Sequence, residues 1–494
     1  MKIKLIFPKG QYHNFWDPRT SVLLSGKRYS SIPLSLPTLA ALCPVHDEVE
    51  IIDENIDDID FERPADLVAI SFFTAFAVRA YEIADEFRRR GVKVVLGGIH
   101  ASALPDEGLA HADSVMIGEA EDVWPQIVED CRNNKLKSKY QSAEKPDLQK
   151  LVIPRWDLLD VKKYNFFTIQ STRGCPFNCE FCSVSNFFGR GFRTKPIDNV
   201  IQEIKYLKKL VGNKTIVFAD DNFIGNPKYA KELIIKLIEN GINNWWCQAS
   251  INLSNEDELL NLMAKSGCKQ VFIGFESLSE ESLTLMNKKV NLAHDFLKSV
   301  SKIHSYGISV FGSFIVGYDG DGKDVFKKTV DFINTSKIAF ALVGLLVPFP
   351  DTPLYKRLEK EERLVCRDWD KYNGEHVCFL PKKMDAEELE EGHRWVLKNI
   401  YSYNSLYNRL DNLWDRGVLI KKDGMGPLKN ISLKKLAVIS KALFNKDFRE
   451  DKNRVKFLLR SIFHKNNPRF FSIFSAIDFH DVVEEYLHDN NDKF

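Results

Sequence analysis

Three closely spaced cysteines, Cys175, Cys179 and Cys182, are the residues of this sequence with the clearest capacity for chemistry. Three thiolates on one short loop can hold three irons of a cubane [4Fe–4S] cluster, whereas clusters bound by the protein alone use four cysteines. One iron then stays open for a substrate. Zinc bound by these thiolates and a distant fourth ligand is the alternative. It is disfavoured because the loop follows the first strand of a β/α series, where catalytic residues lie.

The other cysteines of the chain show no paired spacing, which argues against a second cluster. They are Cys43, Cys131, Cys247, Cys268, Cys366 and Cys378. Nine cysteines in 494 residues do not form a disulfide scaffold, and a tight cysteine cluster in a reducing compartment indicates metal binding or catalysis. No apolar run reaches the roughly 18–20 residues of a membrane span, and the N-terminal apolar stretch is too short for a signal peptide. We therefore expect a cytoplasmic protein.

The cysteine loop must be positioned by a series of strands and helices that begins near residue 166. The expected strands, each followed by a helical pattern, are Phe167–Thr172, Thr215–Ala219, Trp245–Ala249, Gln270–Phe275, Ser309–Val316 and Ala339–Val347. Six such units predict a partial (β/α)6 barrel over residues 166–358, with catalytic groups at the carboxyl ends of its strands. Beyond it, helical patterns at Ala386–Leu410 and Leu433–Phe444 predict a mostly α-helical C-terminal domain over residues 359–494.

A separate α/β series precedes the barrel. Its expected strands are Lys2–Phe7, Val49–Asp53, Leu67–Ser71, Val92–Leu96 and Ser114–Ile117. Continuous β-branched runs separated by helices predict a doubly wound, Rossmann-like parallel sheet over residues 1–135. Ligands of this fold bind at the carboxyl ends of the strands. The loops Phe72–Ala75, Gly97–His100 and Gly118–Glu121 lie there, and their glycines let a bulky ligand approach the backbone. The polar, Lys-rich residues 136–165 are predicted to be a linker.

The formal net charge of +1 conceals a basic C-terminal stretch. Residues 416–469 hold 15 Lys or Arg against 4 Asp or Glu, which indicates a surface that meets anions. Within it, Lys434, Lys435 and Lys441 interleave with apolar residues at helical spacing, a pattern typical of peripheral membrane helices. The alternative is a solvated helical face. No nucleic-acid partner is expected.

The stretch Arg173–Cys182 resembles the signature of the radical S-adenosylmethionine (SAM) superfamily. In that family the open iron binds SAM, and an electron from the cluster cleaves SAM into methionine and a 5′-deoxyadenosyl radical. Further resemblances follow in order: Phe218–Phe223 for the methionine end of SAM, Phe272–Ser277 for the ribose, and Ser313–Gly317 for the adenine. Pro348–Tyr355 resembles a family turn, with Asp351 in place of glycine. The implied SAM contacts are Asp220, Asp221, Asn222, Glu276, Ser277 and Gly317.

The N-terminal domain resembles the cobalamin-binding module that precedes many radical SAM domains, on the stretches Val94–Ser102, Pro105–Glu107 and Gly118–Pro125. The absent D-x-H-x-x-G motif implies base-off cobalamin without a protein histidine on cobalt, so that His100 would cap a loop or contact the nucleotide tail. The implied cobalamin contacts are Ser71, Thr74, Gly97, Gly98, His100, Gly118 and Glu119. A structural domain that has lost cobalamin is the alternative.

Together these resemblances imply a cobalamin-dependent radical SAM methyltransferase that acts on an unactivated carbon. One SAM would methylate cobalamin, and a second SAM would yield the radical that takes a hydrogen atom from the substrate. Such a carbon has no proton for a base to remove, so ordinary acid–base catalysis fails and the cofactors carry the hard step. A non-methylating cyclisation, oxidation or carbon–carbon bond formation is the alternative within the family, and a non-catalytic sensor is the alternative outside it.

The partners follow from the same resemblances. The region Asp368–Arg394 and the helices after it loosely resemble hopanoid C-methylases, which implies a small-molecule or lipid substrate. The cluster would need an electron donor such as flavodoxin or ferredoxin. A lipid substrate would fit a cytoplasmic enzyme whose residues 416–469 touch a membrane surface.

Overall fold

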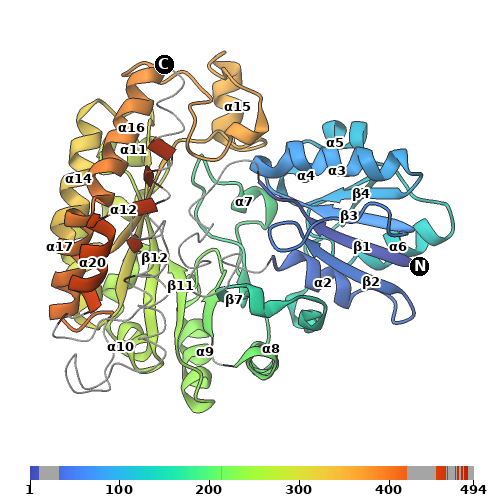
Figure 1. Ribbon diagram of the computed structural model, residues 1–494, viewed down its shortest axis with the longest axis horizontal. Helices are drawn as coiled ribbons and strands as arrows, with labels where there is room; N and C mark the ends of the chain where they lie inside the picture. The colour runs from blue at the N-terminus through green and yellow to red at the C-terminus, as the bar shows by residue number, and fades with distance from the viewer. Residues whose placement is uncertain are drawn as a thin grey trace.

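The computed structural model describes residues 1–10, 33–212, 214–419 and 452–462, together with separate residues between 464 and 487. Figure 1 shows two lobes, each built on its own sheet. The N-terminal lobe holds the first sheet, and the larger lobe holds the second sheet and the C-terminal helices. This arrangement confirms the predicted α/β architecture.

The first sheet is parallel, with strand order β2-β1-β3-β4-β5-β6. Its strands are β1 (Lys2–Phe7), β2 (Glu48–Asp53), β3 (Leu67–Ser71), β4 (Lys93–Gly97), β5 (Ser114–Ile117) and β6 (Lys139–Gln141). The strand order reverses between β1 and β3, and this switch point is where doubly wound folds bind ligands.

Helices cover both faces of the first sheet, as its buried strands require. They are α2 (Ser35–Ala41), α3 (Ala77–Arg89), α4 (Ile99–Ala103), α5 (Pro105–His111) and α6 (Trp124–Arg132). Alternate residues of the strands enter two separate hydrophobic clusters, one with Ile83 of α3 and the other with Trp124 of α6. Burial on both faces explains the continuous apolar runs of the sequence.

The linker expected over residues 136–165 is only partly a linker. Lys139–Gln141 form β6, which pairs in parallel with β5 at the edge of the first sheet. The sheet therefore extends past residue 135. Three residues that include a Lys and a Gln carry too little apolar pattern to predict a strand, and the pairing with β5 supplies what the local sequence lacks.

The second sheet is also parallel and remains open, with order β14-β13-β12-β11-β10-β7. Its strands are β7 (Phe166–Ile169), β10 (Thr215–Phe218), β11 (Trp245–Ala249), β12 (Cys268–Glu276), β13 (Ser309–Val316) and β14 (Phe340–Leu345). The helices between them are α7 (Val184–Phe187), α8 (Ile197–Val211), α9 (Pro227–Glu239), α10 (Asp257–Lys265), α11 (Glu280–Leu285), α12 (Lys289–Leu292), α13 (Phe296–Ser305) and α14 (Asp324–Ser336). This is the predicted partial barrel of six β/α units.

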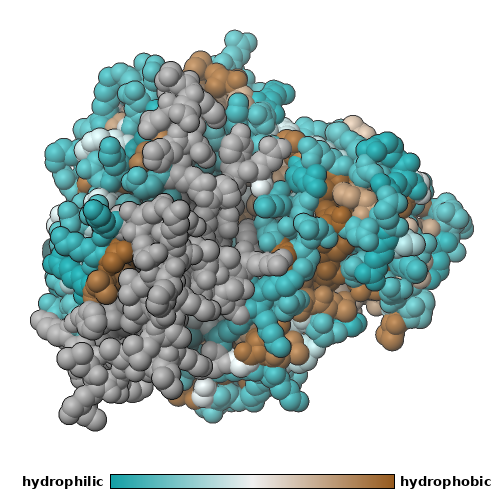
Figure 2. Space-filling view, in the orientation of Figure 1, coloured by the Kyte–Doolittle hydropathy of each residue, from teal (hydrophilic) through white to brown (hydrophobic). Residues whose placement is uncertain are grey.

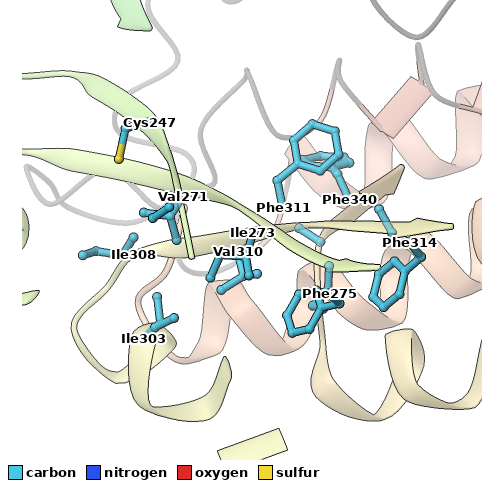
Figure 3. Close-up of a cluster of buried hydrophobic side chains, with 14 of the residues drawn as sticks. Cys247, Val271, Ile273, Phe275, Ile303, Ile308, Val310, Phe311, Phe314 and Phe340 are labelled. Carbon is cyan, nitrogen blue, oxygen red and sulfur yellow. The ribbon is translucent and has the colours of Figure 1, made fainter. Parts of the chain in front are cut away.

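Large aromatic side chains fill the core of the second sheet. Figure 3 shows Phe311 and Phe340 on one face of the strands and Phe275 and Phe314 on the other. The rings of Phe275 and Phe314 are stacked, with 5.2 Å between their centroids. Strand alternation thus gives each face its own apolar layer, which fixes the register of β12 and β13.

The expected first barrel strand is shorter than predicted. Strand β7 ends at Ile169, and Thr172–Arg173 turn away as β8 to pair in antiparallel with β9 (Arg193–Thr194). This small ribbon frames the cysteine loop, so the break redirects the chain into the candidate site.

The C-terminal helices α15 (Pro353–Lys360), α16 (Ala386–Tyr401), α17 (Tyr403–Asp415) and α20 (Lys452–Ile462) pack on the barrel lobe. Leu389 of α16 and Trp414 of α17 belong to the same hydrophobic cluster as the barrel strands. The one helix expected over Ala386–Leu410 is two, because Ser402 leaves the helical conformation and its hydroxyl caps α17. The expected helix Leu433–Phe444 lies outside the described residues.

None of the described helices combines the length and the apolar character that crossing a membrane requires. On the face of the molecule in Figure 2, the described surface is mostly hydrophilic, and hydrophobic residues gather in patches over the N-terminal lobe.

Candidate functional site

A cavity of about 880 Å³ lies where the carboxyl ends of both sheets meet. Its walls come from the loops after β3, β4 and β5 on one side and from barrel residues such as Gln170, Asp221 and Ser313 on the other. Both fold types bind ligands at these strand ends, so the cavity is shared by two binding regions.

Six of the seven residues expected to contact cobalamin lie in the cavity wall: Ser71, Thr74, Gly97, Gly98, Gly118 and Glu119. Gly98 has a φ of +96°, and a Cβ at this position would lie 2.5 Å from the carbonyl oxygen of Phe72. Only glycine allows this backbone path. The loops pack backbone against backbone and leave their outer surface to the cavity.

His100 is placed differently. Its side chain is fully buried, is absent from the cavity wall, and packs against Phe72, Tyr81 and Trp369. Its Nε2 atom lies 3.5 Å from Oε1 of Glu107. The same carboxylate accepts hydrogen bonds from the Tyr81 hydroxyl at 2.9 Å and the Trp369 indole at 2.7 Å. This placement gives no support to a cofactor contact for His100.

The cysteine loop lies between β8 and α7. Burial raises the pKa of all three thiols, that of Cys182 to about 12, whereas the Lys288 ammonium lowers them. Cys175 and Cys179 also raise the pKa of Cys182 by charge repulsion, because the thiols lie near one another. Among the described residues, no three His, Cys, Asp or Glu side chains are already arranged as a metal site. The Lys288 ammonium thus favours the thiolate form that cluster ligands require, against the larger, opposing effect of burial.

Two aspartates after β10, which the sequence predicts as SAM contacts, hydrogen-bond the backbone just before and at the start of the cysteine loop. The Asp220 carboxylate accepts hydrogen bonds from the backbone N–H groups of Ser171 and Thr172 at 2.6 and 2.9 Å. Asp221 accepts one from Gly174 at 2.9 Å. Burial raises the pKa of both aspartates to about 6. Of the two, Asp221 lies in the cavity wall.

The other expected SAM contacts lie deeper in the barrel. Asn222 hydrogen-bonds Ser250, which ties β10 to β11. Glu276 pairs with Lys288 at 2.9 Å beside the thiols. The remaining two, Ser277 and Gly317, donate hydrogen bonds to Asp321 through Oγ and the backbone N–H. Of these four residues, Glu276 lies near the thiols, since its charge raises the pKa of Cys179, and none of the four lines the cavity.

A buried ion cluster that sequence analysis missed joins the two lobes. The Arg173 guanidinium lies 2.6 Å from Glu119 and 2.5 Å from Glu121, and Arg193 lies 2.7 Å from Glu119. Arg173 precedes the cysteines by two positions, and Glu119 follows Gly118 of the cavity wall. Arg173, Glu119 and Glu121 lie in the stretches that resemble family motifs and Arg193 does not, and the sequence carries no signal that pairs residues so far apart.

A second network fixes the cysteine loop to the helix that follows the barrel. Glu180, which lies between two of the cysteines, pairs with Arg357 of α15 at 2.6 Å, and its carbonyl accepts a hydrogen bond from the Leu354 N–H at 3.0 Å. Before α15, the turn that resembles the family pattern places Asp351 at a φ of +65°. Glycine reaches this region freely, which explains why the family pattern has glycine there.

Comparisons with known proteins agree with this geometry. A model of the radical SAM superfamily matches residues 169–333, a B12 binding domain model matches residues 22–128, and a domain of unknown function (DUF4070) matches residues 352–488. The fold is similar to that of TsrM from Kitasatospora setae, solved with cobalamin and a [4Fe–4S] cluster, with a TM-score of 0.64, 16% identity and 99% of each chain covered.

Two curated relatives are named as methylases. Bacteriochlorophyllide d C-12(1)-methyltransferase of Chlorobaculum tepidum is 34% identical over 390 residues, which cover 77% of this chain and 85% of that protein. Hopanoid C-2 methylase of Rhodopseudomonas palustris is 31% identical over 348 residues, which cover 68% of this chain and 66% of that protein.

Fold and cavity define an enzyme in which a doubly wound domain and a radical SAM barrel share one site. The chain belongs to the cobalamin-dependent radical SAM enzymes. Its cofactors are a [4Fe–4S] cluster, SAM and cobalamin. The residues fit them, because three neighbouring thiols lie beside Lys288 and glycine loops open onto the cavity, although none of the three cysteines lines it.

Proposed function

We propose that the enzyme transfers a methyl group to an unactivated carbon of a large, mainly apolar small molecule. The observation that carries the proposal is the shared cavity, because the loops proposed to bind cobalamin and the strand ends of the barrel both line it. Apolar side chains such as Phe7, Leu39 and Phe349 contribute much of its wall. A substrate between the lobes would lie within reach of both cofactors.

In this proposal Cys175, Cys179 and Cys182 hold the cluster, and Asp220 and Asn222 position its surroundings through their hydrogen bonds. The proposed SAM contacts are Asp221, Glu276, Ser277 and Gly317, and the proposed cobalamin contacts are Ser71, Thr74, Gly97, Gly98, Gly118 and Glu119. When bound, SAM on the cluster supplies a radical that removes a hydrogen atom, and cobalamin supplies the methyl group. The protein binds and orients the cofactors and the substrate, and it excludes water from the site.

The substrate class is proposed from the cavity together with the relatives. Bacteriochlorophyllide d and hopanoids, for which the two relatives are named, are both large ring molecules. A molecule of this class, including a lipid, fits a wall that is mostly apolar. We further propose that reduced flavodoxin or ferredoxin supplies the electron, and that residues 416–469 contact a membrane surface.

The test is an anaerobic assay of the reconstituted enzyme with SAM, cobalamin, reduced flavodoxin and either bacteriochlorophyllide d or a hopanoid mixture. We expect 5′-deoxyadenosine, S-adenosylhomocysteine and a product that is heavier by one methylene. 5′-Deoxyadenosine with a changed substrate but without S-adenosylhomocysteine would instead support a non-methylating reaction. Absence of 5′-deoxyadenosine from a fully loaded enzyme would contradict the proposal.

A further inference from the structure

The segment between α15 and α16 crosses from one lobe to the other along the cavity. Trp369 and Tyr372 belong to the hydrophobic cluster of the first sheet. Gly374, five positions after Trp369, contacts the other lobe. Its carbonyl accepts a hydrogen bond from the backbone N–H of Leu345 at the end of β14, with an N–O distance of 2.8 Å. A molecule held between the two lobes would therefore contact this segment.

The segment places two carboxyl groups in the cavity wall, those of Asp370 and Glu375, which are five positions apart in the sequence. Asp370 lies near the first sheet, since its 3-10 helix packs against the Thr74–Phe76 turn. Glu375 lies near the end of β14. The matched domain of unknown function includes both residues, and neither takes part in the cluster, SAM or cobalamin contacts proposed above.

Asp370 is a buried carboxylate with an unsatisfied oxygen. The residue is 6% exposed, and its Oδ1 atom has no hydrogen-bond partner among the described residues. Burial raises its pKa to about 6, with Asp368 and Glu82 adding to the shift. A buried acceptor without a partner costs free energy because it has lost its water. A ligand that donates a hydrogen bond to Oδ1 of Asp370 would offset this cost.

Glu375 has a backbone that is fixed independently of its carboxyl group. Its N–H donates to Asn373 Oδ1 at 3.0 Å, and its carbonyl accepts from the Tyr486 hydroxyl at 3.0 Å. Among the described residues, the carboxyl group receives one long hydrogen bond, of 3.4 Å from the Asn373 side-chain amide. Burial alone raises its pKa to about 8, so at neutral pH the group is mostly a neutral acid that can donate a hydrogen bond.

We propose that Asp370 and Glu375 bind the polar groups of the substrate, so that this segment selects a large apolar ring molecule that carries uncharged oxygen-containing groups. Asp370 would accept a hydrogen bond from a hydroxyl or N–H group, and Glu375 would donate one to a carbonyl or hydroxyl oxygen. The inference rests on the proposed function, because it requires the substrate to lie between the lobes.

The experiment measures binding rather than turnover. Wild-type holoenzyme and the variants Asp370→Ala, Glu375→Ala and Glu375→Gln are titrated with bacteriochlorophyllide d and, in a separate arm, with a hydroxylated hopanoid. Glu391→Ala is the matched control, because Glu391 is exposed on α16 and lies outside the cavity wall. Far-UV circular dichroism and the melting temperature report whether each variant is folded.

Each alanine variant should weaken binding of one probe by about 5- to 100-fold, the range for a lost buried hydrogen bond. Glu375→Gln keeps a donor and should stay within about threefold of wild type, as should Glu391→Ala. Folded alanine variants that bind like wild type would overturn the proposal, and so would loss of bound cobalamin, which would make these residues cofactor contacts. Wild-type enzyme that binds neither probe would refute the substrate class. 5′-Deoxyadenosine formation by wild type separates that result from failure of the proposed function.

Discussion

Arg173 and Glu119 face each other across the boundary between the lobes, with 2.6 Å between Nη1 and Oε2. Both side chains are nearly inaccessible, with exposed fractions of 10% and 2%. Because Arg173 opens the cysteine loop and Glu119 belongs to a loop of the cavity wall, this ion pair sets the position of one loop relative to the other. Arg193 and Glu121 extend the pair into a network, which also keeps each charge compensated.

Removal of the central arginine should therefore destabilise the protein. Arg173→Met leaves two buried carboxylates without their shared partner, and we expect the free energy of unfolding to fall by about 3 kcal/mol. Denaturant unfolding followed by circular dichroism measures this change. Lys327→Met is the control, because Lys327 forms an exposed pair with Asp331 and should change little. Equal effects of the two substitutions would show that the lobes do not depend on the ion cluster.

The second prediction concerns the three cysteines of the loop. Changing Cys175, Cys179 and Cys182 together to Ala should abolish iron binding and 5′-deoxyadenosine formation, because the three thiolates have no substitutes in the loop. Iron analysis and the absorbance of the anaerobic protein give the occupancy. Cys366→Ala, at a partly exposed position outside the loop, should retain the cluster. A triple variant with a full four-iron cluster would place the cluster on other residues.

The sequence could predict the parts of the fold that local patterns specify. Strand β12 is a buried apolar run, and α14 has its apolar residues at helical spacing. The local pattern of each element therefore indicates which of its residues are buried. Cysteine spacing likewise locates the loop without reference to distant residues. Strand β6, in contrast, forms because it pairs with the edge of β5. Its local sequence does not predict this pairing.

The limits of predicting the site residues from the sequence have the same physical origin. The motif of Asp220 predicts a SAM contact, but its carboxylate accepts hydrogen bonds from the backbone N–H groups of Ser171 and Thr172, just before the cysteine loop. For His100 the resemblance implies a loop cap or a contact to the nucleotide tail of cobalamin, and Trp369, far along the chain, completes its buried surroundings. Motifs identify a stretch of chain that matters, whereas the direction of each side chain depends on tertiary packing.

Titration of Glu375 should make stability depend on pH. Burial holds its folded pKa at about 8, above the ordinary glutamate value of 4.5, so between these pH values the unfolded state releases a proton that the folded state keeps. This group's contribution to stability is therefore lost as pH rises from about 5 to 8, at up to about 1.4 kcal/mol per pH unit. Glu375→Gln should remove that dependence. Melting curves of both proteins across this range test it, and parallel curves would contradict it.

The turn before α15 offers a stabilising substitution. Asp351 holds a φ of +65°, a region that costs a residue with a Cβ about 1–2 kcal/mol. Asp351→Gly should raise the free energy of unfolding by about 0.5–1 kcal/mol, because part of the relief is offset by greater freedom of the unfolded chain. The exposed pair with Lys356 that is lost contributes little. Asp351→Ala keeps the Cβ and should bring no gain in thermal unfolding.

The last prediction concerns the basic stretch 416–469. Residues 420–451, which include Lys434, Lys435 and Lys441, lie outside the described residues. Within the described part, α20 buries Phe457 and Leu458 against the barrel lobe, so these side chains serve packing rather than membrane contact. A membrane role would therefore depend on the amphipathic stretch Leu433–Phe444, whose lysines could each contribute about 1 kcal/mol beside acidic headgroups.

Co-sedimentation of the full chain with neutral and anionic vesicles tests that role. We expect binding to anionic vesicles only, weakened by high salt because added ions screen the attraction. The triple change of Lys434, Lys435 and Lys441 to Glu should abolish this binding. The control is a double change to Glu at Lys327 and Lys328 of α14, which are exposed, and it should not abolish binding. Equal, negligible binding to both kinds of vesicle would refute membrane contact, and a substrate delivered from solution would then explain the cavity better.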